Sequence, residues 1–255
     1  MFILLLCAGS AQALANSSTL RIVQSGDTVP DQNGRFSNFL EPTISSSNLV
    51  VFSASLYDTS GGNDDDSGIY RMNIPGGIAP FVVTLDQVAR EDGYFIAGDG
   101  TYVLGDLYPL ASYQPVNAPL IDFTSGNFSR LALQLPITGS GTGNSILAVE
   151  GSNSFQLIAE SGATVESGNG EYSEFNAFSI GGISSGNQVP FFSALNNTEN
   201  GSDDNTAVFR YEPDGQVTEI IRKGDAPGGD TLTHLASIRS NAYGDSIFLG
   251  TDSLG

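Results

Sequence analysis

Two acidic loops, at residues 63–68 and 202–205, hold the side chains best suited to chemistry in this sequence. Closely spaced carboxylate and amide oxygens are ligands that a hard cation such as Ca²⁺ accepts. The first loop ends at Gly68 but lacks the bidentate glutamate of an EF-hand, since Ile74 occupies that position. We favour the interpretation that each loop is a solvated acidic hairpin. Calcium is the one candidate cofactor, and a bound calcium ion would hold a loop in place between two strands. The candidate calcium ligands are Asn63, Asp64, Asp65, Asp66, Asp203 and Asp204.

Catalytic arrangements of the common kinds are incomplete. The segment 182–186, GISSG, has the form of a serine-hydrolase elbow around Ser184, but such an elbow needs a following helix and a histidine base. His234 is the only histidine, and the chain offers no second one to complete a zinc site. The 28 acidic residues would allow the carboxylate pair of a glycosidase, yet no tryptophan is available to stack on a sugar. We predict no catalytic residue.

The charge balance excludes two classes of partner. The 255 residues carry a net charge of -19, from 28 acidic and 9 basic residues. Such a charge repels phosphate backbones and anionic lipid headgroups, so we expect neither nucleic-acid binding nor polybasic membrane binding. Cationic ligands are favoured.

Residues 1–15, MFILLLCAGSAQALA, have the apolar run and the small residues of a secretory leader, with cleavage before Leu14 or Asn16. The run of about 10 apolar residues is too short for a bilayer, which needs about 20. A buried N-terminal strand is the alternative. Cleavage would remove Cys7, the only cysteine, and leave no disulfide. We expect an exported protein, secreted or held at the cell surface.

Internal repetition is the strongest pattern in the chain. Residues 22–77 align with residues 158–215, and a shorter pattern extends the repetition to four copies. Each copy has a small polar residue, then Asn or Gly three positions later, then a large apolar residue after four more. The copies are Ser45/Asn48/Phe52, Thr124/Asn127/Leu131, Ser184/Asn187/Phe191 and Asn241/Gly244/Phe248.

These copies predict hairpin turns that feed strands, because Asn and Gly tolerate a positive φ. Side chains alternate along a strand, so Val50 should face the core with Phe52, and Val189 with Phe191. A second landmark is an apolar pair before a glycine turn. It occurs at Ile22-Val23 before Gly26, at Leu157-Ile158 before Gly162 and at Ile220-Ile221 before Gly224. No apolar stripe of helical period is long enough to predict a helix.

The segment 241–248, NAYGDSIF, fits an NxxGxxxF motif in full, while the other copies place Ser or Thr first and Asn at the glycine position. Over residues 19–255 the chain thereby resembles bacterial choice-of-anchor tandem-repeat surface proteins with NxxGxxxF units. The resemblance implies export and display on a bacterial cell surface, with a sorting tail beyond residue 255. It implies no activity, cofactor or catalytic residue.

We therefore predict an all-β repeat domain over residues 16–255, with four-stranded units at about 19–80, 81–156 and 157–216 and a truncated unit at 217–255. Such units suit β-propeller blades, here an incomplete ring in a fragment of a longer chain. An open β array or sandwich is the alternative.

Constant strands with loops of variable length predict a non-enzymatic surface or extracellular module. We expect it to bind a protein or a glycan through loops such as 60–68 and 108–119. One alternative is a secreted hydrolase that acts on a polysaccharide or an ester on a propeller-like scaffold. Another is a calcium-stabilised structural element of a cell coat.

Overall fold

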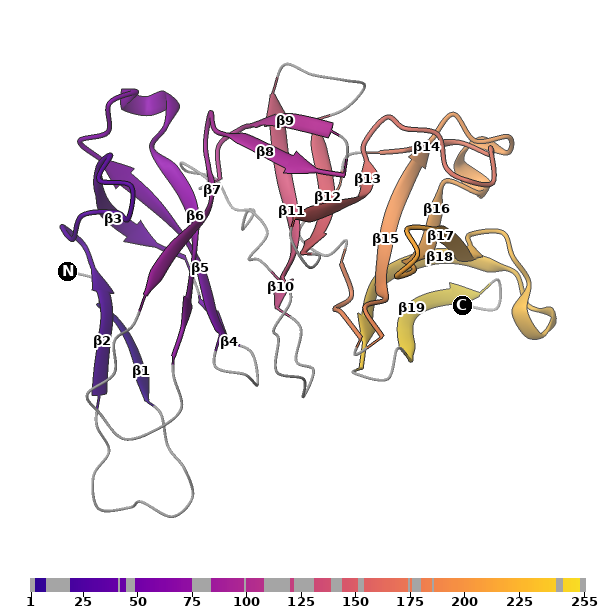
Figure 1. The fold of residues 1–255 in the computed structure, drawn as a ribbon. Helices are drawn as coiled ribbons and strands as arrows, with labels where there is room; N and C mark the ends of the chain where they lie inside the picture. Colours follow the sequence, from indigo (N-terminus) through magenta and orange to yellow (C-terminus); the bar gives the residue numbers. More distant parts are fainter. Residues whose placement is uncertain are drawn as a thin grey trace, which may run out of the picture.

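The computed structural model is all-β, and short 3-10 turns are the only helical elements among the residues that it describes (Figure 1). It describes residues 3–7, 19–40, 42–44, 49–74, 84–98, 100–107, 120–121, 131–138, 144–150, 154–173, 175, 180–184, 186–241 and 245–252. Within these ranges no helix is long and apolar enough to span a bilayer. The prediction of an all-β chain with four-stranded antiparallel sheets is confirmed.

Within the described ranges, three sheets and two hairpins make up the fold. Sheet 1 contains β3 (Arg35–Phe39), β4 (Thr43–Ile44), β5 (Leu49–Tyr57), β6 (Ser67–Asn73) and β7 (Leu85–Arg90). Sheet 2 contains β8 (Tyr94–Ala97), β9 (Gly100–Leu104), β10 (Leu120–Ile121), β11 (Leu131–Thr138), β12 (Ser145–Glu150) and β13 (Phe155–Glu160). Sheet 3 contains β14 (Glu171–Tyr172), β15 (Val189–Asn196), β16 (Thr206–Tyr211) and β17 (Val217–Arg222). The hairpins are β1 (Ile3–Cys7) with β2 (Thr19–Gln24), and β18 (Leu232–Ser240) with β19 (Ser246–Asp252).

Each sheet follows one plan of four antiparallel strands. The strand order is β3-β5-β6-β7 in sheet 1, β9-β11-β12-β13 in sheet 2 and β14-β15-β16-β17 in sheet 3. Sheet 2 adds β8, which forms a hairpin with β9 and one parallel pair with β13. The fourth strand of each sheet is the apolar segment that opens the next repeat of the sequence. One sequence repeat therefore closes one sheet and supplies the first three strands of the next.

A turn of constant geometry carries the chain from each fourth strand into the next sheet. In all four copies a residue with positive φ donates its N–H to the first strand of that sheet at 2.7 to 3.0 Å. The donors and acceptors are Gly26 with Phe36, Asp92 with Leu104, Gly162 with Tyr172, and Gly224 with Leu232. The three predicted glycine turns are thus confirmed, and Asp92 forms a fourth that the sequence pattern did not identify.

The sheets pack face to face in chain order, as the strand β12 shows. Ile146 and Ala148 join a buried cluster with Val51 and Ile69 of sheet 1. Leu147, the residue between them, joins a second cluster with sheet 3. Because alternate side chains of a strand point to opposite faces, sheet 2 lies between its two neighbours and is covered on both faces. Each fully buried apolar side chain contributes roughly 1.5 to 3 kcal/mol.

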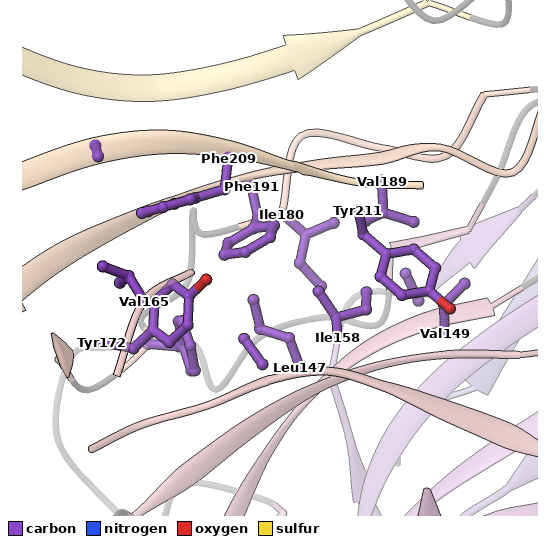
Figure 2. Packing of buried hydrophobic residues seen from close by; sticks show 14 of the residues in the cluster. Leu147, Val149, Ile158, Val165, Tyr172, Ile180, Val189, Phe191, Phe209 and Tyr211 are labelled. Carbon is purple, nitrogen blue, oxygen red and sulfur yellow. The ribbon is translucent and has the colours of Figure 1, made fainter. Parts of the chain in front are cut away.

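Aromatic side chains fill the space between sheets 2 and 3. Phe191 stacks on Phe209 with 5.3 Å between ring centroids, and Tyr172 packs edge-on against Phe209 at 5.2 Å. Figure 2 shows Leu147 and Ile158 of sheet 2 across from these rings.

The predicted sharing of a strand face is confirmed in both repeats. Val50 and Phe52 lie in the same buried cluster of sheet 1. Val189 and Phe191 both lie in the cluster between sheets 2 and 3.

Several predicted positions lie outside the described residues: the loop 108–119 and residues Ser45, Asn48, Thr124, Asn127, Ser185 and Gly244. At the N-terminus, Ile3–Cys7 pairs antiparallel with β2. While it stays attached, this segment is a strand, and its removal as a leader remains a prediction.

Gly170 provides a test of the turn that precedes β14. Its φ is +107°, and an added Cβ would lie 2.8 Å from Thr198 Cγ2 and 3.0 Å from the carbonyl oxygen of Asn196. We expect Gly170→Ala to lower the free energy of unfolding by about 2–3 kcal/mol, through backbone strain and this clash. Gly168→Ala is the matched control, because its φ is also positive at +79° but nothing lies within 4 Å. Urea unfolding that gave equal losses for the two variants would contradict the close approach.

Candidate functional site

Asp65 and Asp204 occupy equivalent places in a repeated polar arrangement, which we term the polar latch. It consists of Asn33, Asp65 and Arg90 in sheet 1 and of Asn169, Asp204 and Arg222 in sheet 3. Asn33 Nδ2 donates to the Asp65 carboxylate at 2.7 Å, and Asn169 Nδ2 donates to the Asp204 carboxylate at 2.9 Å. The same asparagines accept a backbone N–H through Oδ1 at 2.8 Å, from Ser60 and Glu199. The polar latch thus ties the loop before the first strand to the loop after the second.

A nearly buried arginine closes each latch from the fourth strand. Arg90 donates to the carbonyl oxygens of Asn33 at 2.7 Å and of Asp65 at 2.9 Å. Arg222 donates to the carbonyl oxygens of Asn169 at 2.9 Å and of Asp204 at 3.3 Å. Only 8% and 7% of the two arginine side chains are exposed. The arginine side chains thus supply hydrogen-bond donors to loop carbonyls that lie outside the strand pairing.

Hydrogen bonding keeps both latch carboxylates charged. Burial alone would raise the pKa of Asp204, but hydrogen bonds from Thr198, Asn169 and Asn200 outweigh it and lower that pKa. The pKa of Asp65 is lowered by the same balance. Both carboxylates therefore act as charged hydrogen-bond acceptors within the polar latch.

The other predicted ligands separate into two groups. Asn63, Asp64 and Asp203 are exposed in or beside short 3-10 turns, which fits the favoured interpretation of a solvated acidic hairpin. Asp66 is different, because it meets two acids from elsewhere in the chain.

Asp66, Glu91 and Asp106 form a cluster of carboxylates at the junction of sheets 1 and 2. One carboxylate oxygen from each lies within 4.8 Å of the others. Asp66 precedes β6, Glu91 follows β7 and Asp106 follows β9. Ser67 Oγ donates to the Glu91 carboxylate at 2.7 Å and accepts the N–H of Leu107 at 2.8 Å. Because Leu107 follows β9 of sheet 2, the second of these hydrogen bonds joins the two sheets next to the cluster.

Burial and repulsion alter the ionisation of this cluster. Burial raises the pKa of Glu91 to about 7, and repulsion from Asp106 and Asp66 adds to this against the opposing hydrogen bond from Ser67. The pKa of Asp66 is raised as well, first by burial and then by Asp106. Three such carboxylates need a proton or a cation to neutralise them, and a hard cation such as Ca²⁺ suits an all-oxygen set.

The same positions at the other junctions carry different side chains. Backbone hydrogen bonds identify the equivalents, since Glu91, Ser161 and Lys223 all donate their N–H to the first residue of the third strand. The position of Asp66 is likewise taken by Asn144 and Asn205, whose carbonyls accept the same second-strand N–H. At these two positions the side chains are therefore both acidic between sheets 1 and 2, both uncharged between sheets 2 and 3, and an asparagine with a lysine after sheet 3.

Glu91→Gln tests the ionisation of the cluster. Because the folded pKa of Glu91 lies above its ordinary value of 4.5, the native state binds the proton more tightly than the unfolded state. This group therefore stabilises the fold at acidic pH and loses that contribution as the pH rises from about 4.5 to 7. We expect the melting temperature of the wild type to fall relative to Glu91→Gln over this range, by about 2–4 °C for a contribution near 1 kcal/mol. Glu199→Gln, at an exposed loop position, is the control; parallel pH profiles for wild type and Glu91→Gln would contradict the raised pKa.

Ser184 and His234, the residues considered for catalysis, lie in different elements of the structure. Ser184 is buried and its Oγ accepts the N–H of Gln188 at 3.1 Å, in a tight turn before β15. His234 is exposed in β18. The Ser184 turn continues into a strand, whereas a nucleophile elbow would lead into a helix.

The comparisons with known proteins assign the chain to a family. A family model described as "Family of unknown function (DUF7453)" matches residues 10–102 and 120–254. No curated protein and no solved structure matches the chain.

Proposed function

The chain belongs to the DUF7453 family, and we propose that it is a non-enzymatic binding module in which propeller-like sheets present variable side chains at their junctions. The ligand is a protein or a glycan. Sheets that stack face to face with a repeated turn are the arrangement of propeller blades, and the loops at such junctions are the surfaces that those folds use for binding.

One observation supports this proposal most strongly. The backbone hydrogen bonds around positions 66 and 91 are repeated at all three junctions, while the side chains there change from Asp66 and Glu91 to Asn205 and Lys223. By contrast, the position just before Glu91 and Lys223 keeps an arginine in both latches, Arg90 and Arg222, while Glu160 occupies it in sheet 2, which has no latch of this kind among the described residues. Differing charge on a constant frame is what a binding surface requires.

The acidic junction favours a positively charged ligand, and two matched polysaccharides test this preference. We expect the protein at mildly acidic pH to bind chitosan oligosaccharides, whose amines are then charged, at least tenfold more tightly than chitin oligosaccharides of the same length, whose amines are acetylated. A tenfold change corresponds to about 1.4 kcal/mol. Glu91→Gln combined with Asp106→Asn should remove the preference, while Asp230→Asn at an exposed site should leave it. Equal binding of both polymers by the wild type would contradict a charge-selective surface.

The competing hydrolase is tested with the same variants. Turnover of an ester or glycoside substrate that was lost in Glu91→Gln would overturn the proposal of a non-enzymatic module. A raised carboxyl pKa is what a general acid needs, so this is the residue to test first.

A calcium-stabilised structural element is the second candidate function, favoured by the convergence of Asp66, Glu91 and Asp106. Calcium at a hundredfold excess over its Kd would stabilise the fold by about 2.7 kcal/mol. We expect calorimetry to show a higher melting temperature with calcium than with a chelator, and no such difference in Asp66→Asn. An unchanged wild-type melting temperature would remove this candidate.

Display on a bacterial cell surface completes the proposal, supported by the resemblance to tandem-repeat surface proteins. Labelling of intact cells with a membrane-impermeant amine reagent should modify Lys223, which lies at the third junction. Protection of Lys223 until the cells are lysed would contradict display.

A further inference from the structure

Each polar latch contains an asparagine followed by a glycine, and the structure explains why both residues are needed. The asparagine must donate from Nδ2 and accept at Oδ1, as Asn33 does with Asp65 at 2.7 Å and with the N–H of Ser60 at 2.8 Å. The glycine that follows has a φ of +112° at Gly34 and of +107° at Gly170. An added Cβ there would lie 2.7 and 2.8 Å, respectively, from a threonine methyl group. The fold therefore requires the same Asn-Gly pair at both places.

An Asn-Gly pair is especially prone to lose ammonia, because glycine has no side chain to shield its backbone nitrogen. That nitrogen attacks Cγ of the asparagine and gives up its proton to a base, while the Cγ–Nδ2 bond breaks and ammonia leaves with a proton taken from water. A second water molecule then opens the succinimide ring and leaves an aspartate or an isoaspartate. The sequence contains three Asn-Gly pairs, at Asn33, Asn169 and Asn200.

The closed latch protects its asparagine from this reaction. Both latch glycines are buried and both latch asparagines are partly buried. In sheet 3 the carboxamide of Asn169 is held through both of its polar atoms, by Asp204 at 2.9 Å and by the N–H of Glu199 at 2.8 Å. The reaction needs base and water at the glycine, so it waits for local opening of the latch. The third pair, Asn200-Gly201, is exposed at both residues and is the natural comparison.

The product of the reaction is unable to close the latch. A carboxylate in place of the asparagine amide has no donor for Asp65 or Asp204, and the positions now joined by hydrogen bonds of 2.7 and 2.9 Å would hold two carboxylates. Because the pKa of each latch aspartate is lowered, both groups would be charged at neutral pH and would repel each other. An isoaspartate would also lengthen the backbone beside the carbonyl oxygen that the latch arginine binds.

We propose that Asn33 and Asn169 are modification sites, at which deamidation follows the opening of the polar latch and then keeps the latch open. Sheets 1 and 3 thereby each carry a slow switch that water alone does not reverse. In sheet 1 the released loop is the one that leads from Asp65 into Asp66 of the carboxylate cluster, so the modification also loosens the junction between sheets 1 and 2.

Peptide mapping by mass spectrometry, after incubation of the full chain at mildly alkaline pH, measures the rate at each site. We expect deamidation of Asn33 and Asn169 to be at least tenfold slower in the folded chain than in urea, and that of the exposed Asn200 to be slowed less. Arg222→Ala should speed the reaction of Asn169 at least tenfold and leave that of Asn33 within about twofold, because sheet 1 keeps its own latch. Arg90→Ala is the matched variant and should give the reverse.

Asn169→Asp reproduces the product directly and tests the proposal whatever the stability of Arg222→Ala. We expect a lower melting temperature at neutral pH, and recovery of at least half of the loss when Asp204→Asn is added, because an amide then again faces a carboxylate. Asn197→Asp is the control, since Asn197 donates to Glu171 at the similar distance of 2.9 Å but at an exposed site. It should leave the melting temperature nearly unchanged.

Three outcomes would overturn the proposal. The first is deamidation of Asn33 and Asn169 at the same rate in the folded chain as in urea, or equal slowing of Asn169 and the exposed Asn200. The second is a folded Arg222→Ala variant in which Asn33 and Asn169 are accelerated equally or not at all. The third is an Asn169→Asp variant that melts at the same temperature as the wild type.

Discussion

Arg222→Ala is expected to destabilise the protein by about 3–5 kcal/mol. The guanidinium donates to the carbonyl oxygens of Asn169 and Asp204, pairs with Glu219 at 2.6 Å, and leaves only 7% of the side chain exposed. Removing one partner from such a group leaves buried polar atoms without hydrogen bonds, which is costly. The free energy of unfolding by urea measures the loss.

Arg210→Ala is the control for the arginine itself. Arg210 pairs with Glu212 in the same sheet, but 35% of its side chain is exposed, so its removal should cost less than about 1 kcal/mol. The account of the polar latch would be wrong if the two variants unfolded at the same urea concentration. Arg90→Ala should reproduce the large effect in sheet 1.

Phe191→Ala is expected to cost about 3–5 kcal/mol as well, for a different reason. The ring is fully buried, stacks on Phe209 and fills the space between sheets 2 and 3, so its truncation leaves a cavity at that interface. Phe192→Ala changes the next residue on the same strand, whose ring lies on the opposite face and is partly exposed. It should cost about 1–2 kcal/mol, and equal losses for the two rings would contradict the packing of sheet 3 against sheet 2.

The local pattern of the fold could be read from the sequence because strand alternation and glycine turns are local signals. The shared faces of Val50 with Phe52 and of Val189 with Phe191 follow from a period of two residues. The fourth turn was missed because Asp92 takes the positive φ that glycine takes in the other copies. Most aspartates have a negative φ, so an aspartate in the sequence does not by itself mark a turn of this kind.

One predicted equivalence was wrong by two residues. The sequence pattern matched Leu131 to Phe52, whereas the strand pairing matches Leu133 to Phe52. A shift of two positions keeps every side chain on the same face, so the alternation of apolar residues cannot distinguish the two alignments.

The grouping of polar residues depends on pairing over long distances in the chain, which no local pattern reveals. Asn33 meets Asp65 across 32 residues, and Arg90 reaches Asn33 across 57. Glu91 joins Asp66 only because β7 pairs with β6. The sequence therefore identified acidic loops, while the separation into structural latches and a carboxylate cluster required the sheets.

The division of each repeat between two sheets has a functional consequence. The fourth strand of one sheet leads directly into the first strand of the next, so residues just after it, such as Glu91, lie where two sheets meet. Side chains can change at that position without disturbing the strand pairs on either side. This is the structural basis for our proposal that a binding surface lies at the junctions.

The central claim is that one four-stranded unit, with one joining turn, is repeated along the chain. Couplings across hydrogen bonds, measured by NMR on the deuterated protein, test it most directly. The account predicts that the amides of Gly26, Asp92, Gly162 and Gly224 couple to the carbonyls of Phe36, Leu104, Tyr172 and Leu232, respectively. Couplings to unrelated carbonyls in two or more of the four turns would show that the units fold differently and would contradict the claim.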